Sequence, residues 1–370
     1  MIEPLLEQKD ANGRTLFPAD YKSFMIAETN LDRYSRQMRF SGIGEDGQRK
    51  LIATRVAISG CGALGTVIAN GLVRAGIGFV RIIDRDFIEL NNLQRQLLFD
   101  EQDIADNLPK AEAAARKLRK INSQVVIEPA IRNLDATNVE ALLGDVDCIL
   151  DATDNFDTRF LINDFAIQKS KPWIFGACIG SEGQSMTIVP GKTPCLRCFM
   201  EDPPAAGTMP TCETAGILSS ASTIVASFQV AEAIKILSGN ESEINRGFIV
   251  FDLWENTFRR LSIEGLLKDH ECPACTKKQF DWLEGRMGTN SVVLCGRNAV
   301  QFVPPNRKTV DLAALRARLA DVATVRGNEY LLRFTIDEYE FSVFPDSRAI
   351  IKGTADLALA RSLYDRYVGG

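Results

Sequence analysis

The sequence predicts an α/β fold: a doubly wound, Rossmann-like, mostly parallel sheet with a structural zinc site, followed by a small α+β domain at the C-terminus. Three features predict this fold. Short apolar runs alternate with helical patterns between residues 55 and 178, as in parallel strands joined by crossover helices. A glycine-rich turn follows the first of these runs. Two C-x-x-C pairs lie further along the chain.

The expected strands are short apolar segments, namely residues 55–60, 79–86, 124–129, 146–154, 172–178 and 247–253. The expected helices between them are rich in helix formers, namely residues 63–76, 110–122 and 160–170. A long helix follows residue 216. Its core-facing stripe is expected to comprise Ile217, Ala221, Ile224, Phe228 and Ala231.

These patterns divide the chain into three segments. Residues 1–29 are polar and aperiodic, so we expect an N-terminal arm there. Residues 30–285 carry the alternating strands and helices of a nucleotide-binding domain. They include a loop, residues 200–216, that is long for a connection within a domain and therefore a candidate functional loop. Residues 286–370 read as strands, a hairpin and two helices, which predicts a small α+β domain.

Composition and charge argue against several classes of protein. The chain has 370 residues and a formal net charge of −5, so it lacks the basic footprint of a nucleic-acid-binding protein. No apolar run is long enough to span a membrane, and the first residues lack the pattern of a signal peptide, so we expect a cytoplasmic protein. His270 is the only histidine, which argues against a histidine-centred dehydrogenase or hydrolase.

The stretch ISGCGALG contains a G-x-G-x-x-G fingerprint made by Gly60, Gly62 and Gly65. Such glycines permit a tight turn, close approach of the backbone to a phosphate, and close packing of helix on strand. Asp84, at the end of the next strand, can accept hydrogen bonds from ribose hydroxyls. These residues predict a nucleotide site, the alternative being a tight turn without a ligand.

Four polar residues near strand ends help to choose the nucleotide. Asn92 and Arg95 follow the second strand, Lys110 begins a helix, and Asp154 follows a later strand. An arginine and a lysine converging on one crevice suit a triphosphate better than a dinucleotide, and a carboxylate at a strand end suits Mg²⁺. Each residue taken singly is equally well explained as a surface charge, so the prediction depends on their joint placement.

The two C-x-x-C pairs are the strongest single motif: Cys195 with Cys198, and Cys272 with Cys275. Four thiolates make a tetrahedral site that suits structural zinc and leaves no open position for catalysis. The two pairs are further apart than in a zinc ribbon, so the metal would join distant segments of the chain. A redox role for either pair alone is the alternative.

The remaining cysteines differ in their expected settings. Cys212 lies in the long loop just before a helix, where the helix dipole would lower its pKa and favour the thiolate; the alternative is an inert loop cysteine. Cys178 is a second candidate nucleophile, although its strand setting favours burial. Cys61, Cys148 and Cys295 are expected to be buried small residues.

All of these motifs occur in one order: RYSRQ (33–37), GCGALG (60–65), DRD (84–86), NNLQRQ (91–96), LPK (108–110), ATDN (152–155), the two C-x-x-C pairs, and TCETAG (211–216) between the pairs. In this combination the chain resembles the ThiF/MoeB/HesA family of ubiquitin-activating-enzyme-like adenylyltransferases over roughly residues 30 to 280. The resemblance makes residues 30–285 an ATP-binding adenylation domain. Residues 286–370 are similar to the extra domain of certain bacterial ThiF-type proteins.

The resemblance implies that ATP, not NAD, occupies the glycine turn. The enzyme would activate the C-terminal Gly-Gly carboxylate of a small ubiquitin-like sulfur carrier, forming an acyl-adenylate and pyrophosphate, for thiamin or molybdenum-cofactor biosynthesis. The implied partners are this carrier, a second copy of the chain in a homodimer, and a sulfur-donor protein.

The resemblance also implies roles for single residues. Arg36 of RYSRQ would reach the triphosphate bound to the other subunit. The remaining roles are ribose binding by Asp84, phosphate binding by Asn92, Arg95 and Lys110, and Mg²⁺ binding by Asp154. In some relatives the cysteine matching Cys212 is linked covalently to the carrier or relays sulfur, whereas in others activity does not require it.

Two other functions stay open. The acceptor could be a peptide or small-molecule carboxylate in natural-product maturation, with the C-terminal domain as a substrate clamp. The chain could also be a nucleotide-binding scaffold without turnover, but its intact set of Arg36, Arg95, Lys110 and Asp154 argues against that. The chain itself ends in Gly369 and Gly370, but a helical pattern precedes them, so we expect a frayed end rather than self-recognition.

Overall fold

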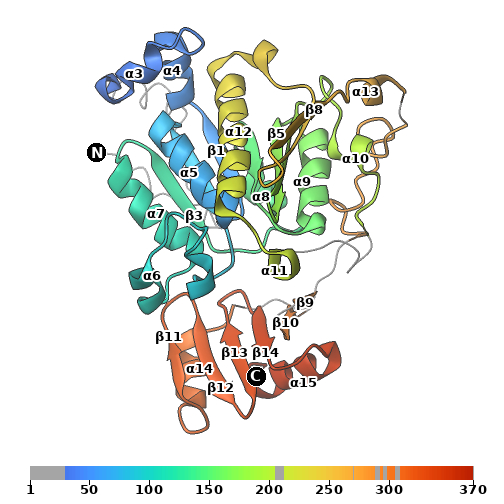
Figure 1. Ribbon diagram of the computed structural model, residues 1–370. Coiled ribbons are helices and arrows are strands. Elements are labelled where there is room, and N and C mark those ends of the chain that lie inside the picture. Colours follow the sequence, from blue (N-terminus) through green and yellow to red (C-terminus); the bar gives the residue numbers. More distant parts are fainter. Residues whose placement is uncertain are drawn as a thin grey trace. The chain divides into compact units, whose positions relative to one another are not determined.

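The computed structural model describes residues 30–204, 212–269, 271–287, 292–294, 298–304 and 309–369. Two compact units divide the chain (Figure 1). Unit 1 extends to Ala105 and then from Pro109 to Met287, whereas unit 2 comprises Asp106–Leu108 and the chain from Gly288 onward. The expected N-terminal arm, His270 and Cys295 lie outside the described residues.

Unit 1 is built on an eight-stranded sheet of order β3-β2-β1-β4-β5-β6-β7-β8. Its strands are β1 (Arg55–Ser59), β2 (Phe79–Ile83), β3 (Val126–Ala130), β4 (Cys148–Asp151), β5 (Trp173–Ile179), β6 (Glu182–Ile188), β7 (Phe248–Asp252) and β8 (Thr257–Leu261). The first five in spatial order are parallel, and β6, β7 and β8 continue the sheet antiparallel. The order reverses between β1 and β4, and ligands bind at such switch points, outside the carboxyl ends of the strands.

The helices of unit 1 are α3 (Ser35–Met38), α4 (Gly44–Ile52), α5 (Ala63–Ala75), α6 (Glu101–Ala105), α7 (Lys110–Ile121), α8 (Val139–Leu143), α9 (Phe156–Gln168), α10 (Leu196–Phe199), α11 (Cys212–Ala215), α12 (Ser219–Ser238) and α13 (Gly265–Asp269). Short 3₁₀ helices are η1 (Leu31–Tyr34), η2 (Leu90–Asn92) and η3 (Glu241–Glu243).

Helices cover both faces of this sheet, as the sequence predicts. Side chains alternate along β5, so Trp173 and Phe175 join the same buried cluster as Phe160 of α9. On the other face, Gln229 of α12 donates from Nε2 to the carbonyl of Ile174, at 3.0 Å. The fold class is therefore confirmed: a mostly parallel, doubly wound sheet.

The expected strands and helices are confirmed to within a few residues at each end. Helix α5, for example, ends at Gly76, whose φ of 85° is the left-handed conformation that favours glycine at a helix end. Strands β6 and β8 were not predicted from the sequence. All five residues of β8 are exposed, so this edge strand carries no buried apolar alternation to reveal it.

The expected core stripe of the long helix is wrong in part. Helix α12 begins at Ser219, after Ile217; Ala221 is buried, Ile224 and Phe228 are half-buried, and Ala231 is exposed. The deeply buried face lies one position further along and comprises Ala221, Ser222, Val225, Ala226, Gln229, Glu232, Ala233, Leu237 and Ser238. Helical spacing of apolar residues does not reveal this face, because it also contains polar residues. Gln229, for example, is buried there because its side chain finds a hydrogen-bond partner.

By length and composition alone, α12 is also apolar enough to cross a membrane, the one such helix among the described residues. It packs against α5, β5 and β6 in unit 1, as a core helix does (Figure 1). Within its most apolar window 44% is buried, and the exposed residues of the helix are the small Ser220, Ser227 and Ala231.

Unit 2 contains a six-stranded antiparallel sheet of order β11-β12-β13-β14-β10-β9. Its elements are β9 (Val292–Leu294), β10 (Ala299–Phe302), α14 (Leu312–Leu319), β11 (Val325–Gly327), β12 (Leu332–Ile336), β13 (Tyr339–Val343), β14 (Ala349–Lys352) and α15 (Leu357–Tyr367). Both helices pack into one apolar cluster with the sheet, in which Phe334 and Phe341 stack at 4.6 Å.

The expected frayed C-terminus is wrong as far as Gly369. The backbone N–H groups of Val368 and Gly369 both donate to the carbonyl of Tyr364, at 2.8 and 2.9 Å. Arg318 donates to the carbonyl of Val368 at 3.0 Å. Spare carbonyls at the end of α15 therefore hold this segment in place.

Candidate functional site

The three glycines of the turn between β1 and α5 meet different constraints. A Cβ added at Gly60, whose φ is 98°, would lie 2.4 Å from the carbonyl oxygen of Ala152, and one at Gly65 would lie 2.1 Å from that of Gly60. Both positions therefore need glycine for packing. A Cβ at Gly62 would meet only the Nε2 of Gln96, at 3.8 Å. Its backbone is thus open to a ligand.

This turn presents an anion-binding helix end. Gly62 caps α5 without a side-chain hydrogen bond, so the first N–H groups of the helix stay available. The N–H of Cys61 donates instead to Oδ2 of Asp84, at 2.6 Å. Asp84 therefore lies beside the turn, as the sequence analysis expected.

Asp84 and Lys110 belong to one charged group. Asp84 also accepts a hydrogen bond from the N–H of Asp86, at 2.6 Å, and its burial raises the pKa of its carboxyl. Lys110 is buried, with Nζ 3.5 Å from Oδ2 of Asp86. Burial by itself would lower the pKa of Lys110, but the carboxylates of Asp86 and Asp84 outweigh it and raise the pKa. The ammonium thus stays protonated at neutral pH.

Asp154 joins this group from the loop between β4 and α9. Its carboxylate is exposed and close enough to interact electrostatically with Lys110. The structure therefore brings together the glycine turn, Asp84, Lys110 and Asp154 at the carboxyl ends of β1, β2 and β4. A buried cation among carboxylates beside a free helix end is an arrangement that suits a phosphate chain with a divalent cation.

Asn92, Arg95 and Gln96 come from the segment that follows β2. Asn92 is buried at the end of η2, and its side-chain oxygen accepts from the N–H of Glu89, the N-cap, at 3.1 Å. Arg95 donates to the carbonyl of Asn91 at 2.7 Å. Gln96 was missed by the sequence analysis. It is 3% exposed, lies against Gly62, and its Oε1 has no hydrogen-bond partner among the described residues. Its only sequence signal is its position beside Arg95.

The three other candidate site residues, Arg36, Cys212 and Cys178, lie on α3, α11 and β5. Arg36 is exposed on α3, and no hydrogen bond or ion pair among the described residues joins it to the turn. The backbone of Cys212 begins α11, but its side chain is outside the described residues. The strand setting of Cys178 predicted burial, but the residue is only half-buried. It lies near the carboxyl end of β5, where the last three residues are all half-buried.

Cys61 and Cys148 are buried, as expected. Burial raises the pKa of the Cys148 thiol to about 12, so this thiol is inert at neutral pH.

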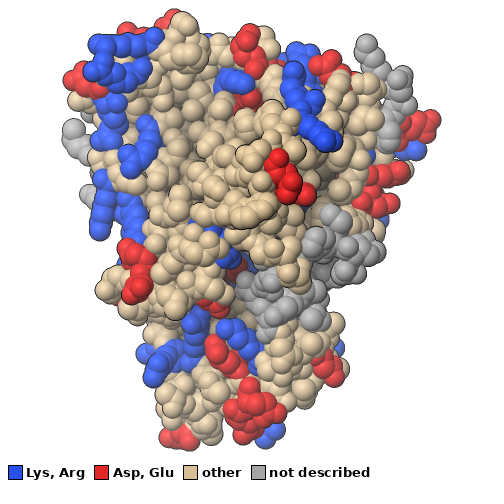
Figure 2. Space-filling model, in the orientation of Figure 1, with Lys and Arg blue, Asp and Glu red and all other residues tan. Residues whose placement is uncertain are grey.

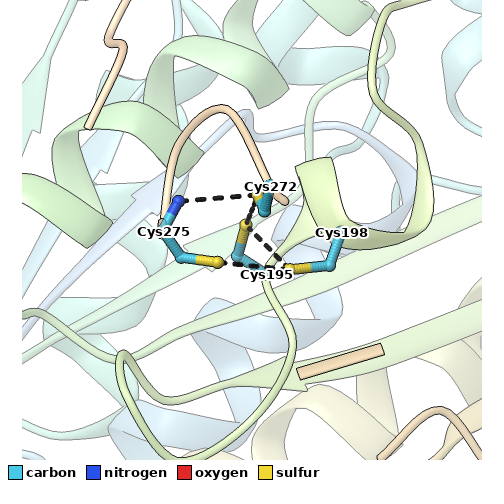
Figure 3. Close-up of side chains that lie close together, drawn as sticks. All are labelled: Cys195, Cys198, Cys272 and Cys275. Atoms are coloured by element: carbon cyan, nitrogen blue, oxygen red, sulfur yellow. Dashed lines mark hydrogen bonds between the residues drawn. The ribbon is translucent and has the colours of Figure 1, made fainter. Parts of the chain in front are cut away.

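The four cysteines of the C-x-x-C pairs converge in one cluster (Figure 3). Cys195 is the N-cap of α10 and Cys198 lies within it, whereas Cys272 and Cys275 lie on a loop 77 residues further along. Their Sγ atoms all lie within 4.8 Å of one another. The sulfur of Cys195 is 3.5 Å from that of Cys272, and the sulfur of Cys198 is 3.3 Å from that of Cys275.

This geometry fits a tetrahedral metal. Four sulfurs at a Zn–S distance of about 2.3 Å would be separated by about 3.8 Å, close to the spacing observed. A redox pair would use one C-x-x-C alone, whereas here the two pairs face each other. The cluster could therefore hold zinc.

Comparison with known proteins gives one family. The model of the ThiF family matches residues 34–274. The Bacillus subtilis protein named sulfur carrier protein ThiS adenylyltransferase is 45% identical over 91% of this chain and 99% of its own length. That alignment spans 339 residues, more than unit 1 contains, so it must extend into unit 2.

Two further proteins match about two thirds of this chain. The Haloferax volcanii SAMP-activating enzyme E1 is 35% identical over 69% of this chain and 93% of its own length. Among solved structures, Escherichia coli MccB with ATP is 25% identical, with a TM-score of 0.57, over 66% of this chain and 75% of that one.

The contrast between Gly62 and Gly65 is testable. Gly65→Ala should lower the free energy of unfolding by about 1–3 kcal/mol, because its methyl group overpacks against Gly60. Gly62→Ala should change it by less than about 0.5 kcal/mol. The same variant should weaken ATP binding roughly tenfold, a loss of about 1.4 kcal/mol. Chemical denaturation and calorimetric titration measure the two quantities; a Gly62→Ala protein that binds ATP normally would contradict an open phosphate site.

The metal assignment has its own test. The purified protein should contain about one zinc per chain, and Cys272→Ser should lose it together with thermal stability, because four ligands are needed to close the site. Plasma mass spectrometry measures the metal content. Cys178→Ser, which also removes one thiol, is the control and should keep the metal. Zinc retained at full stoichiometry in Cys272→Ser would be incompatible with the four-cysteine site.

Proposed function

The chain belongs to the ThiF family, and on that premise we propose that it adenylates the C-terminal carboxylate of a ubiquitin-like sulfur-carrier protein. It is a nucleotidyltransferase that uses ATP, and the carrier serves thiamin or molybdenum-cofactor biosynthesis. The observation that carries the proposal is the placement of Lys110 and Asp154 beside the glycine turn. The 45% identity to a ThiS adenylyltransferase over nearly the whole of both chains supports the same substrate class.

The chemistry needs positioning and charge neutralisation more than proton transfer. A carboxylate is ionised at neutral pH, so its attack on the α-phosphorus requires no general base. The helix end at Gly62 would hold a phosphate, Asp84 the ribose, and Asn92 with Arg95 the phosphate chain. The protonated Lys110 would offset the negative charge that develops on the leaving pyrophosphate.

Magnesium is part of the proposal. Asp154 would hold the ion, since its exposed carboxylate has no hydrogen bond from the described residues and oxygen ligands suit Mg²⁺. When bound, the ion would neutralise charge on the phosphates. The zinc proposed at the four cysteines has a different part, joining two distant segments of unit 1.

We propose further that the active form is a homodimer in which Arg36 serves the partner's site. Its exposure on α3 and its lack of contact with the turn support a role in trans. The edge of the sheet at β8 also carries exposed apolar residues: Trp254 (77% exposed), Phe258 (59%) and Leu261 (44%). Figure 2 shows few charged side chains on the face where α5 and α12 lie in Figure 1.

Sulfur transfer would follow adenylation. An acyl-adenylate is a carboxyl group activated for attack by a sulfur nucleophile, so a sulfur-donor protein is the second proposed partner. Cys212 is the candidate relay in this chain, and the cytoplasm is the proposed compartment, since it keeps such thiols reduced.

The proposed reaction is tested by ATP–pyrophosphate exchange with and without a Gly-Gly carrier. Exchange should require the intact carrier and should fail when its last glycine is removed. Arg95→Ala should reduce the rate about 100-fold or more, as loss of a phosphate-neutralising group does. Arg49→Ala, which removes only an exposed i,i+4 ion pair, should not. Exchange without any carrier would instead favour a peptide or small carboxylate as acceptor, and no exchange at all would favour a scaffold.

The dimer is tested by mixing two inactive variants. Arg36→Ala and Lys110→Ala should each be inactive alone, because each lacks one phosphate contact. After subunit exchange, half of the dimers should contain one intact site, so the mixture should recover about a quarter of the wild-type rate. A mixture that stays inactive, although light scattering shows dimers that exchange subunits, would place Arg36 outside the partner's site.

A further inference from the structure

The position of Asp154 depends on the loop that carries it. No described residue hydrogen-bonds the carboxylate of Asp154, so its own side chain does not fix where it lies. The loop spans the end of β4 and the start of α9, and the N–H of Ala152 donates to the carbonyl of Ser59, at 2.8 Å. Whatever holds the next residue, Thr153, therefore determines where the Asp154 carboxylate is offered to a metal.

Arg159 holds Thr153. Its Nη2 donates to the carbonyl of Thr153 at 2.7 Å and to that of Gly176, on β5, at 3.2 Å. Its Nε lies 3.1 Å from Oδ2 of Asp151. The other carboxylate oxygen of Asp151 accepts from both the N–H and the hydroxyl of Thr153, at 2.9 and 2.7 Å. Arg159 thus binds the carbonyl of Thr153, while Asp151 binds its N–H and its hydroxyl.

The set is buried and rigid. Arg159 is 7% exposed and Asp151 is fully buried, and the guanidinium lies 5.1 Å from the ring centre of Phe175. The carbonyl of Asp151 accepts from Gln229 of α12 at 2.6 Å. The fork of a guanidinium can bond two carbonyls and a carboxylate at once, whereas the single ammonium of a lysine cannot keep that geometry.

Stability alone does not explain this arrangement. Arg159 is in the first turn of α9, whose N-cap is Asn155, and the positive end of the helix dipole disfavours a cation there. A buried ion pair also contributes little net stability compared with apolar side chains of the same size. The Arg159–Asp151 pair does hold the backbone of Thr153, the residue immediately before Asp154, in one position.

We propose that Arg159 is a positioning residue for metal binding: through Thr153 it sets the place of the Asp154 carboxylate that holds Mg²⁺. This inference rests on the proposed function, because it assigns the ion to the same nucleotide site. Residues behind a metal ligand commonly change metal affinity about 10–100-fold when they are altered.

The test measures metal affinity directly. Mn²⁺ is titrated into the full-length protein with a non-hydrolysable ATP analogue, and free Mn²⁺ is read by electron paramagnetic resonance. Arg159→Lys should weaken Mn²⁺ binding about tenfold or more. In the exchange assay it should raise the Mg²⁺ concentration for half-maximal rate by a similar factor, and excess Mg²⁺ should restore much of the rate. Thr153→Val removes only the hydrogen bond from the Thr153 hydroxyl to Asp151. It should therefore weaken Mn²⁺ binding, and raise the Mg²⁺ concentration for half-maximal rate, by a smaller factor than Arg159→Lys does.

Arg197→Lys is the matched control. Arg197 is also buried, pairs with buried Asp164 at 3.6 Å and lies 4.9 Å from the ring centre of Trp282. Among the described residues it makes no hydrogen bond to the loop of Asp154. It should leave Mn²⁺ affinity within about twofold of wild type, a change of less than about 0.4 kcal/mol.

The outcomes separate the two proposals. Unchanged Mn²⁺ affinity in Arg159→Lys, or an equal loss in Arg197→Lys, overturns the positioning role. If Arg159→Lys does not fold, Thr153→Val decides, and unchanged Mn²⁺ affinity in that variant overturns the role. If the wild-type protein binds Mn²⁺ with the analogue but catalyses no pyrophosphate exchange, the adenylation proposal is wrong. The Mn²⁺ titration of Arg159→Lys would still test the positioning role of Arg159.

Discussion

The site depends on how closely the chain approaches itself at the glycine turn. Because Gly60 and Gly65 have no Cβ atom, the backbone at Gly60 can pack against the carbonyl of Ala152, and the backbone at Gly65 against the carbonyl of Gly60. A Cβ at either position would force β1, α5 and the loop after β4 apart. Because they stay together, the free N-terminus of α5, the buried Lys110 and the carboxylate of Asp154 lie close to one another at the switch point of the sheet.

Helix α9 connects the loop of Asp154 to the cysteine cluster. Its first turn carries Arg159, which fixes the loop of Asp154. Further along the helix, Asn163 accepts from the N–H of Leu196, next to Cys195, at 2.9 Å. Asp164 accepts from the N–H of Trp282, beyond Cys275, at 3.1 Å, and burial raises the pKa of its carboxyl to about 6. The cysteine cluster and the loop of Asp154 are therefore both hydrogen-bonded to α9, through different side chains.

The sequence could predict the parts whose signal is local. β1, α5 and β2 have apolar periodicity bounded by glycine, and the C-x-x-C pairs carry metal-ligand spacing within a few residues. Other features depend on contacts between distant segments. Arg159 looks like an ordinary helix residue until β5 supplies the carbonyl of Gly176, and Gln96 is notable only because folding buries its amide against Gly62. The solvent-facing β8 has no apolar alternation at all.

The most direct test of the account follows the carrier itself. A carrier ending in Gly-Gly is incubated with the protein, MgATP and inorganic pyrophosphatase, and its intact mass is read by mass spectrometry. The account predicts that the carrier gains the mass of one adenylyl group, and that hydroxylamine removes it, because an acyl-adenylate is a mixed anhydride. A carrier whose mass stays unchanged while ATP is bound or consumed would contradict activation of the carrier carboxylate by this site.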